Sequence, residues 1–127
     1  MFKYYNCNPL KRQVNDCVVR AISLAENKSW NEVFTKLSKL AEKRCILIDD
    51  TEFVEWYLTE NYDTYCFICN NEHLRIKEFL KLNPIGKYLI TMKGHITCAI
   101  DGYIYDTWDC TNKRIWSVWR VDKWYNV

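Results

Sequence analysis

Apolar residues in the first half of the chain recur at helical spacing. The pattern predicts a first helix over Cys17–Glu26, capped by Asn15 or Asp16 and stopped by Asn27. Its apolar face would comprise Val18, Ala21, Ile22 and Ala25. We therefore expect this helix to pack one side against the rest of the protein.

Further helical patterns follow along the chain. Ser29 and Glu32 have the spacing of a capping box, which predicts a second helix extending to about Lys43. A third helix is predicted over residues 51–60 with Thr51 as its cap, and a fourth within residues 72–84. Between these two, the aromatic and β-branched run at 64–69 is typical of a strand.

The second half of the chain changes to strand-like patterns. Runs at 87–92, 95–100, 103–108 and 114–121 are rich in β-branched and aromatic residues, and Asp101-Gly102 is a strong hairpin signal. Helices that precede an antiparallel sheet are typical of an α+β fold. At 127 residues, we expect one domain over residues 1–127.

Composition narrows the classes of partner. The net charge is +2, and basic residues are interspersed with acidic ones, so no nucleic-acid partner is indicated. The first residues carry charges where a signal peptide is apolar, and no run has the length of a membrane span. We therefore expect a cytoplasmic protein without a membrane partner, in which the seven cysteines are mostly free thiols.

One cysteine differs from the rest by its position. Cys17 begins a predicted helix, and free N–H groups together with the helix dipole favour a thiolate there. The others fall in loops or turns, after a helix, or inside predicted strands: Cys7, Cys45, Cys66, Cys69, Cys98 and Cys110. Cys17 is therefore the candidate nucleophile.

A cysteine nucleophile also needs an imidazole within reach, and the chain has two histidines, His73 and His95. A two-residue turn at 101–102 would oppose His95 to Trp108 and place Asp106 diagonally across from His95. Asp106 could then orient one ring nitrogen and leave the other for the thiol, whereas Asp109 has the wrong parity. Trp108 would cover the pair.

These residues carry a resemblance. A helix-borne Cys, a His at the start of a strand and an Asp on the next strand resemble the papain-like cysteine peptidases. More closely, "NDCVVRAI" and "GKYLITMKGHITCAIDGYIYDTW" resemble small bacterial and phage proteins of that superfamily, akin to bacteriocin-processing peptidase domains, over roughly residues 12–110. The resemblance implies a papain-like fold and a peptidase with Cys17 as nucleophile, His95 as base and acid, and Asp106 as orienting residue. The substrate would be a protein or peptide, with no cofactor or metal.

The oxyanion donor departs from that superfamily's pattern. A Gln commonly lies six residues before the cysteine, and that position is Lys11 in this chain. Gln13 and Asn15 are the substitutes, and we favour Asn15 together with the Cys17 backbone N–H, although Asn15 could instead serve as a helix cap.

Two other functions compete with the peptidase. Cys66 and Cys69 form a C-x-x-C pair followed by His73, which suggests zinc, but a strand would point the two thiols to opposite faces. Alternatively, the chain is a catalytically weak or inactive peptidase-like protein of a phage or mobile element that binds a host protein, such as a defence component. An imperfect triad would favour that alternative, yet all three groups are present.

Overall fold

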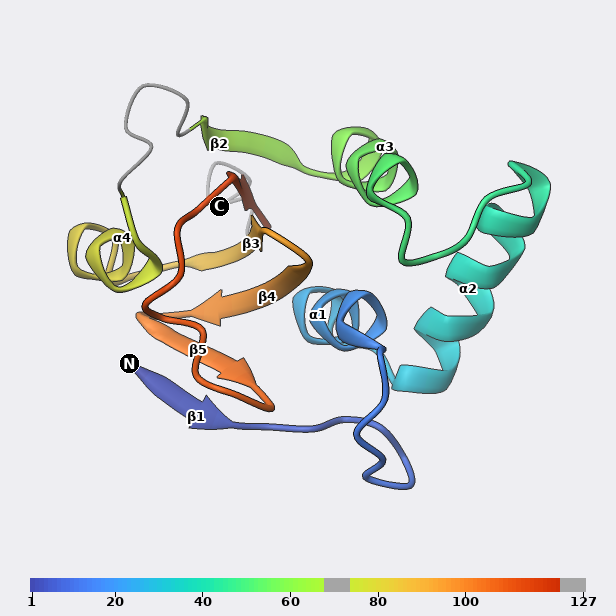
Figure 1. Ribbon diagram of the computed structural model, residues 1–127, viewed down its shortest axis with the longest axis horizontal. Helices are drawn as coiled ribbons and strands as arrows, with labels where there is room; N and C mark the ends of the chain where they lie inside the picture. The colour runs from blue at the N-terminus through green and yellow to red at the C-terminus, as the bar shows by residue number, and fades with distance from the viewer. Residues whose placement is uncertain (68–73, 122–127) are drawn as a thin grey trace.

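Four helices and six strands form an α+β fold within residues 1–67 and 74–121, which the computed structural model describes (Figure 1). The helices are α1 (Cys17–Glu26), α2 (Trp30–Lys43), α3 (Thr51–Asn61) and α4 (Ile76–Leu82). The strands are β1 (Phe2–Tyr4), β2 (Asp63–Phe67), β3 (Lys87–Met92), β4 (His95–Ile100), β5 (Tyr103–Asp106) and β6 (Ser117–Arg120).

The strands form one mixed sheet in the order β1-β5-β4-β3-β6-β2. All neighbouring pairs are antiparallel except β1, which runs parallel to β5 and pairs Tyr4 with Asp106. The prediction of a C-terminal antiparallel sheet is therefore corrected, because an N-terminal strand covers the edge of β5. In that position β1 supports the strand that ends at Asp106.

Several predicted elements have the expected bounds. Helix α1 spans the predicted residues and ends at Asn27, which adopts the left-handed conformation typical of a C-cap. At the start of α2, the Ser29 hydroxyl accepts from the Glu32 N–H at 3.1 Å and the Glu32 carboxylate accepts from the Ser29 N–H at 3.2 Å. The predicted capping box is thus present. Strands β3 and β4 also match their predicted ranges.

Other bounds differ from the predictions for local reasons. Asp50, not Thr51, caps α3, because its carboxylate accepts from the Glu52 N–H at 2.9 Å. Helix α4 begins only at Ile76, since Arg75 is extended and its N–H bonds to the Glu78 carboxylate at 2.7 Å. The predicted residues 68–69 of one strand and 72–73 of this helix lie outside the described residues.

Two predicted strands are shorter than expected. Strand β5 ends at Asp106 because the Thr107 N–H turns to the Asp106 side chain at 2.7 Å. Strand β6 begins at Ser117, three residues later than predicted, because Arg114 forms an isolated bridge with Arg75. As a result, residues 107–116 between β5 and β6 lie outside the two strands.

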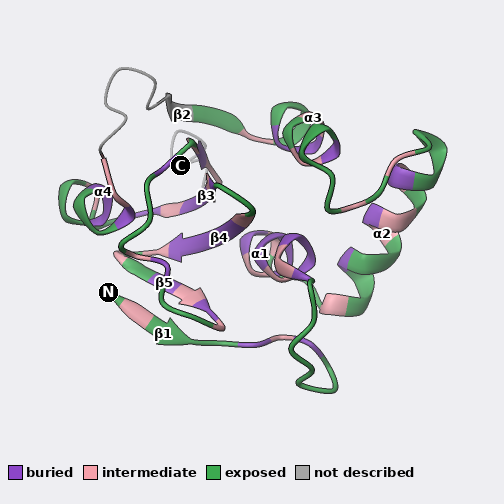
Figure 2. Cartoon of the chain, viewed as in Figure 1, coloured by how far each residue is buried: buried purple, intermediate pink, exposed green. Residues whose placement is uncertain are grey.

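Helices cover both faces of the sheet, and the buried residues in Figure 2 lie along these contacts. Helix α1 packs on β3 and β4, and α2 packs on the other side of α1. One apolar cluster joins α1, α2 and α3 to the sheet through Leu89, Ile96, Cys98 and Trp119. A second cluster joins α4 to the opposite face and includes Ile90, Ala99 and Ile104. Cys17 therefore lies on a helix that is fixed against β4.

Among the described residues, none of the helices has the length and apolar character needed to cross a bilayer.

Candidate active site

The start of α1 presents Cys17 at the edge of the core. Cys17 is the first residue of the helix, where backbone N–H groups lack intrahelical partners. It is half-buried, and Val18, Val19 and Ile22 behind it are buried against the sheet and α2. Because these apolar side chains fix the helix, they also fix the position of the thiol. This agrees with the predicted apolar face of the helix.

The β4–β5 hairpin brings His95 and Asp106 into contact. Its register pairs Ile100 with Tyr103 and Cys98 with Tyr105, as the Asp101-Gly102 turn predicts. The Nε2 atom of His95 lies 2.7 Å from the Oδ2 atom of Asp106. The predicted contact across the hairpin is thus present. It leaves Nδ1 as the ring nitrogen available to Cys17.

The electrostatics of His95 depend on both neighbours. Burial opposes the charged imidazolium, but hydrogen bonding and charge attraction from Asp106 and Cys17 outweigh this and raise the pKa of His95 to about 9. At neutral pH the ring is therefore an imidazolium that donates to Asp106. A cation in this position stabilises a neighbouring thiolate.

Asp106 is almost completely buried and accepts several hydrogen bonds. Its Oδ1 atom accepts from the Arg20 Nη1 atom at 2.8 Å and from the Thr107 N–H at 2.7 Å, while the Cys110 thiol lies 3.9 Å from Oδ2. Burial raises the pKa of this carboxyl group, but His95 and Arg20 outweigh that effect, and the pKa falls to about 2. Asp106 is therefore a carboxylate at every physiological pH.

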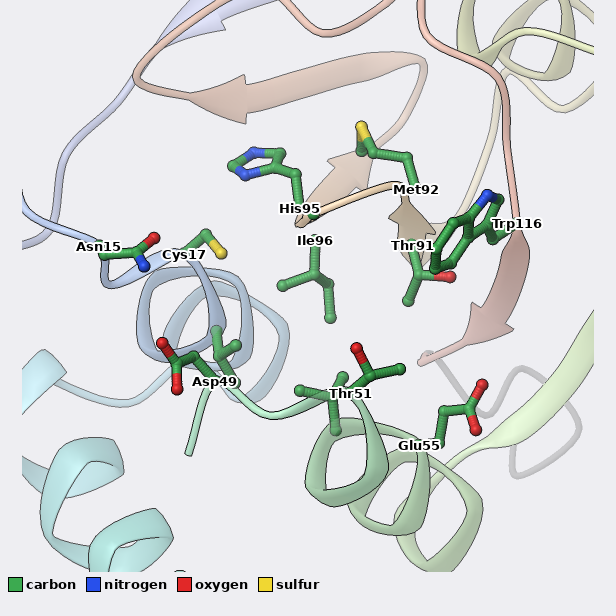
Figure 3. Close-up of a pocket in the computed structure, with 13 residues that line it drawn as sticks. Asn15, Cys17, Asp49, Thr51, Glu55, Thr91, Met92, His95, Ile96 and Trp116 are labelled. Atoms are coloured by element: carbon green, nitrogen blue, oxygen red, sulfur yellow. The ribbon is translucent and has the colours of Figure 1, made fainter. Parts of the chain in front are cut away.

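Cys17 and His95 line the same cavity, of about 130 Å³ (Figure 3). In this view Asn15 and Cys17 lie on one side, and Glu55 and Trp116 lie on the other. The walls come from the start of α1, the segment leading into α3, and the β3–β4 turn: Asn15, Cys17, Val18, Asp49, Thr51, Val54, Glu55, Thr91, Met92, Gly94, His95, Ile96 and Trp116. The thiol and the imidazole are therefore accessible together from one opening.

Asn15 also lines the cavity, whereas Gln13 is not among the lining residues. The N-cap position of α1 is occupied by Asp16, whose side chain makes no capping bond. The capping role considered for Asn15 is therefore not the one observed. Within the described part of the chain, the Asn15 side chain has no hydrogen-bond partner, and it is exposed beside Cys17 (Figure 3). Its amide is thus available to a molecule in the cavity.

Trp108 packs on the imidazole as expected from the hairpin. The two ring centroids are 4.9 Å apart with an interplanar angle of 50°. Trp108 is 40% exposed, so its other face is in contact with solvent. The indole therefore shields one side of the His95–Asp106 contact from water. Asp109, which has the other parity, is exposed and bonds to Thr111.

An apolar groove adjoins the cavity and shares Asn15, Val18 and Asp49 with it. The groove lies between α1, α2 and residues 46–49, and its wall includes Trp30 stacked on Phe34 at 5.0 Å. Its remaining lining residues are Val14, Asp16, Val19, Ser38, Ala41, Glu42, Ile46, Leu47 and Ile48. Apart from His95, the ionisable side chains that line these two hollows other than cysteine are acidic: Asp49 and Glu55 in the cavity, and Asp16, Glu42 and Asp49 in the groove.

One cluster in the described residues has the donor types of a metal site: His95, Asp106 and Cys110, with ligand atoms within 4.8 Å of one another. However, the Arg20 guanidinium also contacts Asp106, and a fixed cation there opposes binding of a metal cation. The alternative zinc site cannot be placed, because Cys69 and His73 lie outside the described residues. Cys66 lies in β2.

The sequence reasoning missed Arg20 and Trp116. Arg20 lies four residues after Asp16 on α1, which is ion-pair spacing on a helix, and that local signal was available. No local pattern could have shown that the same guanidinium reaches Asp106, 86 residues away. Trp116 lines the cavity because its backbone N–H donates to the backbone carbonyl of Thr91 on β3 at 2.8 Å.

Comparisons with models of known protein families, with curated proteins and with solved structures found no match for this chain.

Proposed function

We propose that the protein is a thiol hydrolase, specifically a cysteine peptidase of papain-like arrangement that acts on a protein or peptide. The observation that carries this proposal is the position of the His95 ring, which interacts with the Asp106 carboxylate through Nε2 and with the Cys17 thiol. All three groups come from elements fixed by the core. Nucleophile, base and orienting group are the parts that acyl transfer requires.

In the proposed reaction, the Cys17 thiolate attacks the substrate carbonyl carbon, and the carbonyl oxygen becomes an oxyanion. The Asn15 amide and the Cys17 N–H would donate to that oxygen. The His95 imidazolium then transfers its proton to the leaving amine as the carbon–nitrogen bond breaks, which leaves a thioester. His95 next takes a proton from water, the resulting hydroxide attacks the thioester, and the acid leaves as Cys17 is regenerated.

The surroundings of the cavity support a polypeptide substrate. The cavity is lined by Asp49 and Glu55 as well as by the exposed Trp116, so an exposed segment with a basic residue complements it. Five cysteines are free thiols: Cys7, Cys17, Cys45, Cys98 and Cys110. Because the reaction needs a reduced Cys17, we place it in a reducing compartment, the cytoplasm.

Modification by an alkylating probe near neutral pH tests the proposal. Mass spectrometry should locate the label at Cys17, and His95→Ala should slow that labelling about 10- to 100-fold, because a thiol without its imidazolium is only a few per cent ionised at pH 7. Cys45 is exposed and serves as an internal control whose labelling should not change. Equal, slow labelling of Cys17 and Cys45 in the wild type would contradict the proposal and favour an inactive protein that binds a host partner.

A further inference from the structure

A chain of buried charged groups extends away from the candidate site. The Arg20 Nε atom lies 2.7 Å from the Asp16 Oδ1 atom, and the Arg20 Nη1 atom lies 2.8 Å from the Asp106 Oδ1 atom. The side chain of Arg20 is 10% exposed, that of Asp16 is 6% and that of Asp106 is 2%. Burying one guanidinium between two carboxylates costs desolvation energy that the pairing only partly returns. Such an arrangement therefore invites a functional explanation.

The remaining hydrogen bonds of Asp16 make the arrangement rigid. Trp30 Nε1 donates to Asp16 Oδ2 at 2.9 Å, and Asn8 Nδ2 donates to the same oxygen at 3.3 Å. Asn8 is itself buried and held by Asn6, whose side-chain oxygen accepts from the Asn8 N–H at 3.0 Å. Asp16 is therefore anchored on α2 and on the N-terminal loop, and it fixes one end of the Arg20 guanidinium.

Arg20 connects the two halves of the candidate site. It lies three residues after Cys17, so the two side chains project from the same side of α1. Its guanidinium occupies Oδ1 of Asp106, which leaves Oδ2 for His95. One side chain thus joins the helix that carries the thiol to the strand end that orients the imidazole.

We propose that Arg20 is a positioning residue for the Cys17–His95 pair, which it acts on by fixing the Asp106 carboxylate and by holding α1 in place against the end of β5. The reaction it would serve rests on the proposed function. The positioning itself does not, because it can be read from the ionisation of His95 and the reactivity of Cys17 without any substrate.

Charge gives a second consequence. The groups that interact with His95 are Asp106 and Cys17, Cys110 lies beside them, and Asp49 and Glu55 line the same cavity. Arg20 and Asp16 are connected to His95 through Asp106. Arg20 supplies the positive charge that offsets the two carboxylates. Its removal would leave excess negative charge beside the imidazole, which favours the imidazolium and moves the His95 titration to higher pH.

Three variants separate charge from geometry. Arg20→Met removes the charge and keeps an apolar stem, whereas Arg20→Lys keeps the charge without the two-pronged guanidinium. Arg44→Met is the control, because it removes an exposed arginine that packs on Trp56, and neither residue lines the cavity that contains His95. The measurements are the pH profile of Cys17 alkylation by iodoacetamide, read by mass spectrometry, and the NMR titration of the imidazole carbons of His95. The other histidine, His73, provides a reference signal.

For Arg20→Met we expect the His95 titration midpoint to rise by about one pH unit, and Cys17 alkylation at pH 7 to slow roughly ten-fold because the imidazolium is no longer held beside the thiol. Arg20→Lys should keep the His95 midpoint near the wild-type value but slow Cys17 alkylation several-fold, because lysine cannot hold both carboxylates at once. Arg44→Met should match the wild type. If Arg20→Met does not fold, Arg20→Lys alone tests the proposal: Cys17 alkylation should slow several-fold while the His95 titration midpoint stays unchanged.

Wild-type profiles in Arg20→Met would overturn the proposal, and if that variant does not fold, wild-type profiles in Arg20→Lys would do so. The same changes in Arg44→Met would also overturn it. Failure of the proposed function looks different. In that case wild-type Cys17 reacts no faster than Cys45, while the His95 titration still responds to Arg20→Met.

Discussion

A carboxylate surrounded by several hydrogen-bond donors lies near each end of α1, but the donors at the two ends differ in kind. Near the first turn, Asp106 accepts from His95 and Arg20. At the last residue, Glu26 accepts from the Tyr57 and Tyr62 hydroxyls at 2.6 Å each and from Lys36 at 2.5 Å. The first group contains an imidazole that titrates in an accessible pH range.

In the second group, the two tyrosines hold their protons far above neutrality. Burial and the charge of Glu26 raise the pKa values of Tyr57 and Tyr62 well above their usual range. Burial raises the pKa of Glu26 as well, but Lys36 and the two tyrosines outweigh it and lower that pKa. A buried carboxylate can therefore assist proton transfer only when its hydrogen-bond partner can exchange a proton near the pH at which the protein works.

The largest expected effect comes from Asp106→Asn. Arg20 and the Thr107 N–H both donate to one side of this residue, so the amide oxygen should face them and the NH2 group should face His95. His95 would then accept at Nε2 and be protonated toward Cys17, which is the wrong tautomer for a base. Hydrolysis of an activated ester should slow by about 10³- to 10⁴-fold. Unchanged hydrolysis would remove Asp106 from the mechanism.

Asn15→Ala should have the next largest effect. Removing one oxyanion donor should slow ester hydrolysis by about 10²- to 10³-fold. Alkylation of Cys17 forms no oxyanion, so its rate should stay at the wild-type value. Gln13→Ala is the matched control and should leave both rates unchanged, since Gln13 does not line the cavity. Loss of hydrolysis in Gln13→Ala instead would identify that residue as the donor.

The pH dependence of stability should differ between the groups at the two ends of α1. Because the pKa of His95 is raised from 6.5 to about 9 in the folded protein, its stabilisation is complete below pH 6.5 and is lost as the pH rises through 9. The loss is on the order of 3 kcal/mol, measured as urea unfolding at pH 6 and pH 9.5. His95→Gln should remove this slope. A slope that persists in that variant would assign it elsewhere.

On the acid side, both ends should lose stability. The pKa values of Asp106 and Glu26 are lowered in the folded protein, so their stabilisation is present above their unfolded values near pH 4 and is lost as the pH falls through the folded ones. The N-terminal end of α1 thus loses stability in acid and between about pH 6.5 and 9, whereas the C-terminal end loses it in acid and, through the raised tyrosine pKa values, only above about pH 10.

The smallest expected effect is that of Glu26→Gln. Replacing the carboxylate weakens charge-assisted hydrogen bonds from Tyr57, Tyr62 and Lys36, which should cost about 1.5–3 kcal/mol in urea unfolding. Alkylation of Cys17 should not change, because no partner of Glu26 contacts the site. The exposed Glu42→Gln is the control and should shift stability by less than about 0.5 kcal/mol. A change in Cys17 reactivity would mean that the two ends are coupled through α1.

Local signals were sufficient for much of the fold and for the centre of the candidate site. The capping box at Ser29 and the helical spacing after Cys17 predicted α2 and α1, and the Asp101-Gly102 turn fixed the register that joins His95 to Asp106. These features depend on residues within a few positions of one another. The catalytic roles of the residues remain predictions.

Features that depend on distant residues were missed. Strand β1 has three residues and pairs with β5, about a hundred residues later, so nothing near Phe2 announces it. The contact of Arg20 with Asp106 spans 86 residues. The tyrosines that hold Glu26 lie on or just after α3, and no periodicity in α1 indicates them. Tertiary contacts of this kind are set by packing, which a single sequence does not display.

The long separation between Arg20 and Asp106 has a consequence for biosynthesis. A ribosome synthesises Cys17 nearly eighty residues before it makes His95, and domains acquire non-local contacts only once the later segment is available. Until the β4–β5 hairpin forms, the thiol has neither its imidazole nor its bracing guanidinium contact. The nascent chain therefore carries Cys17 without the contacts that its proposed reactivity requires, and these contacts can form only when translation is almost complete.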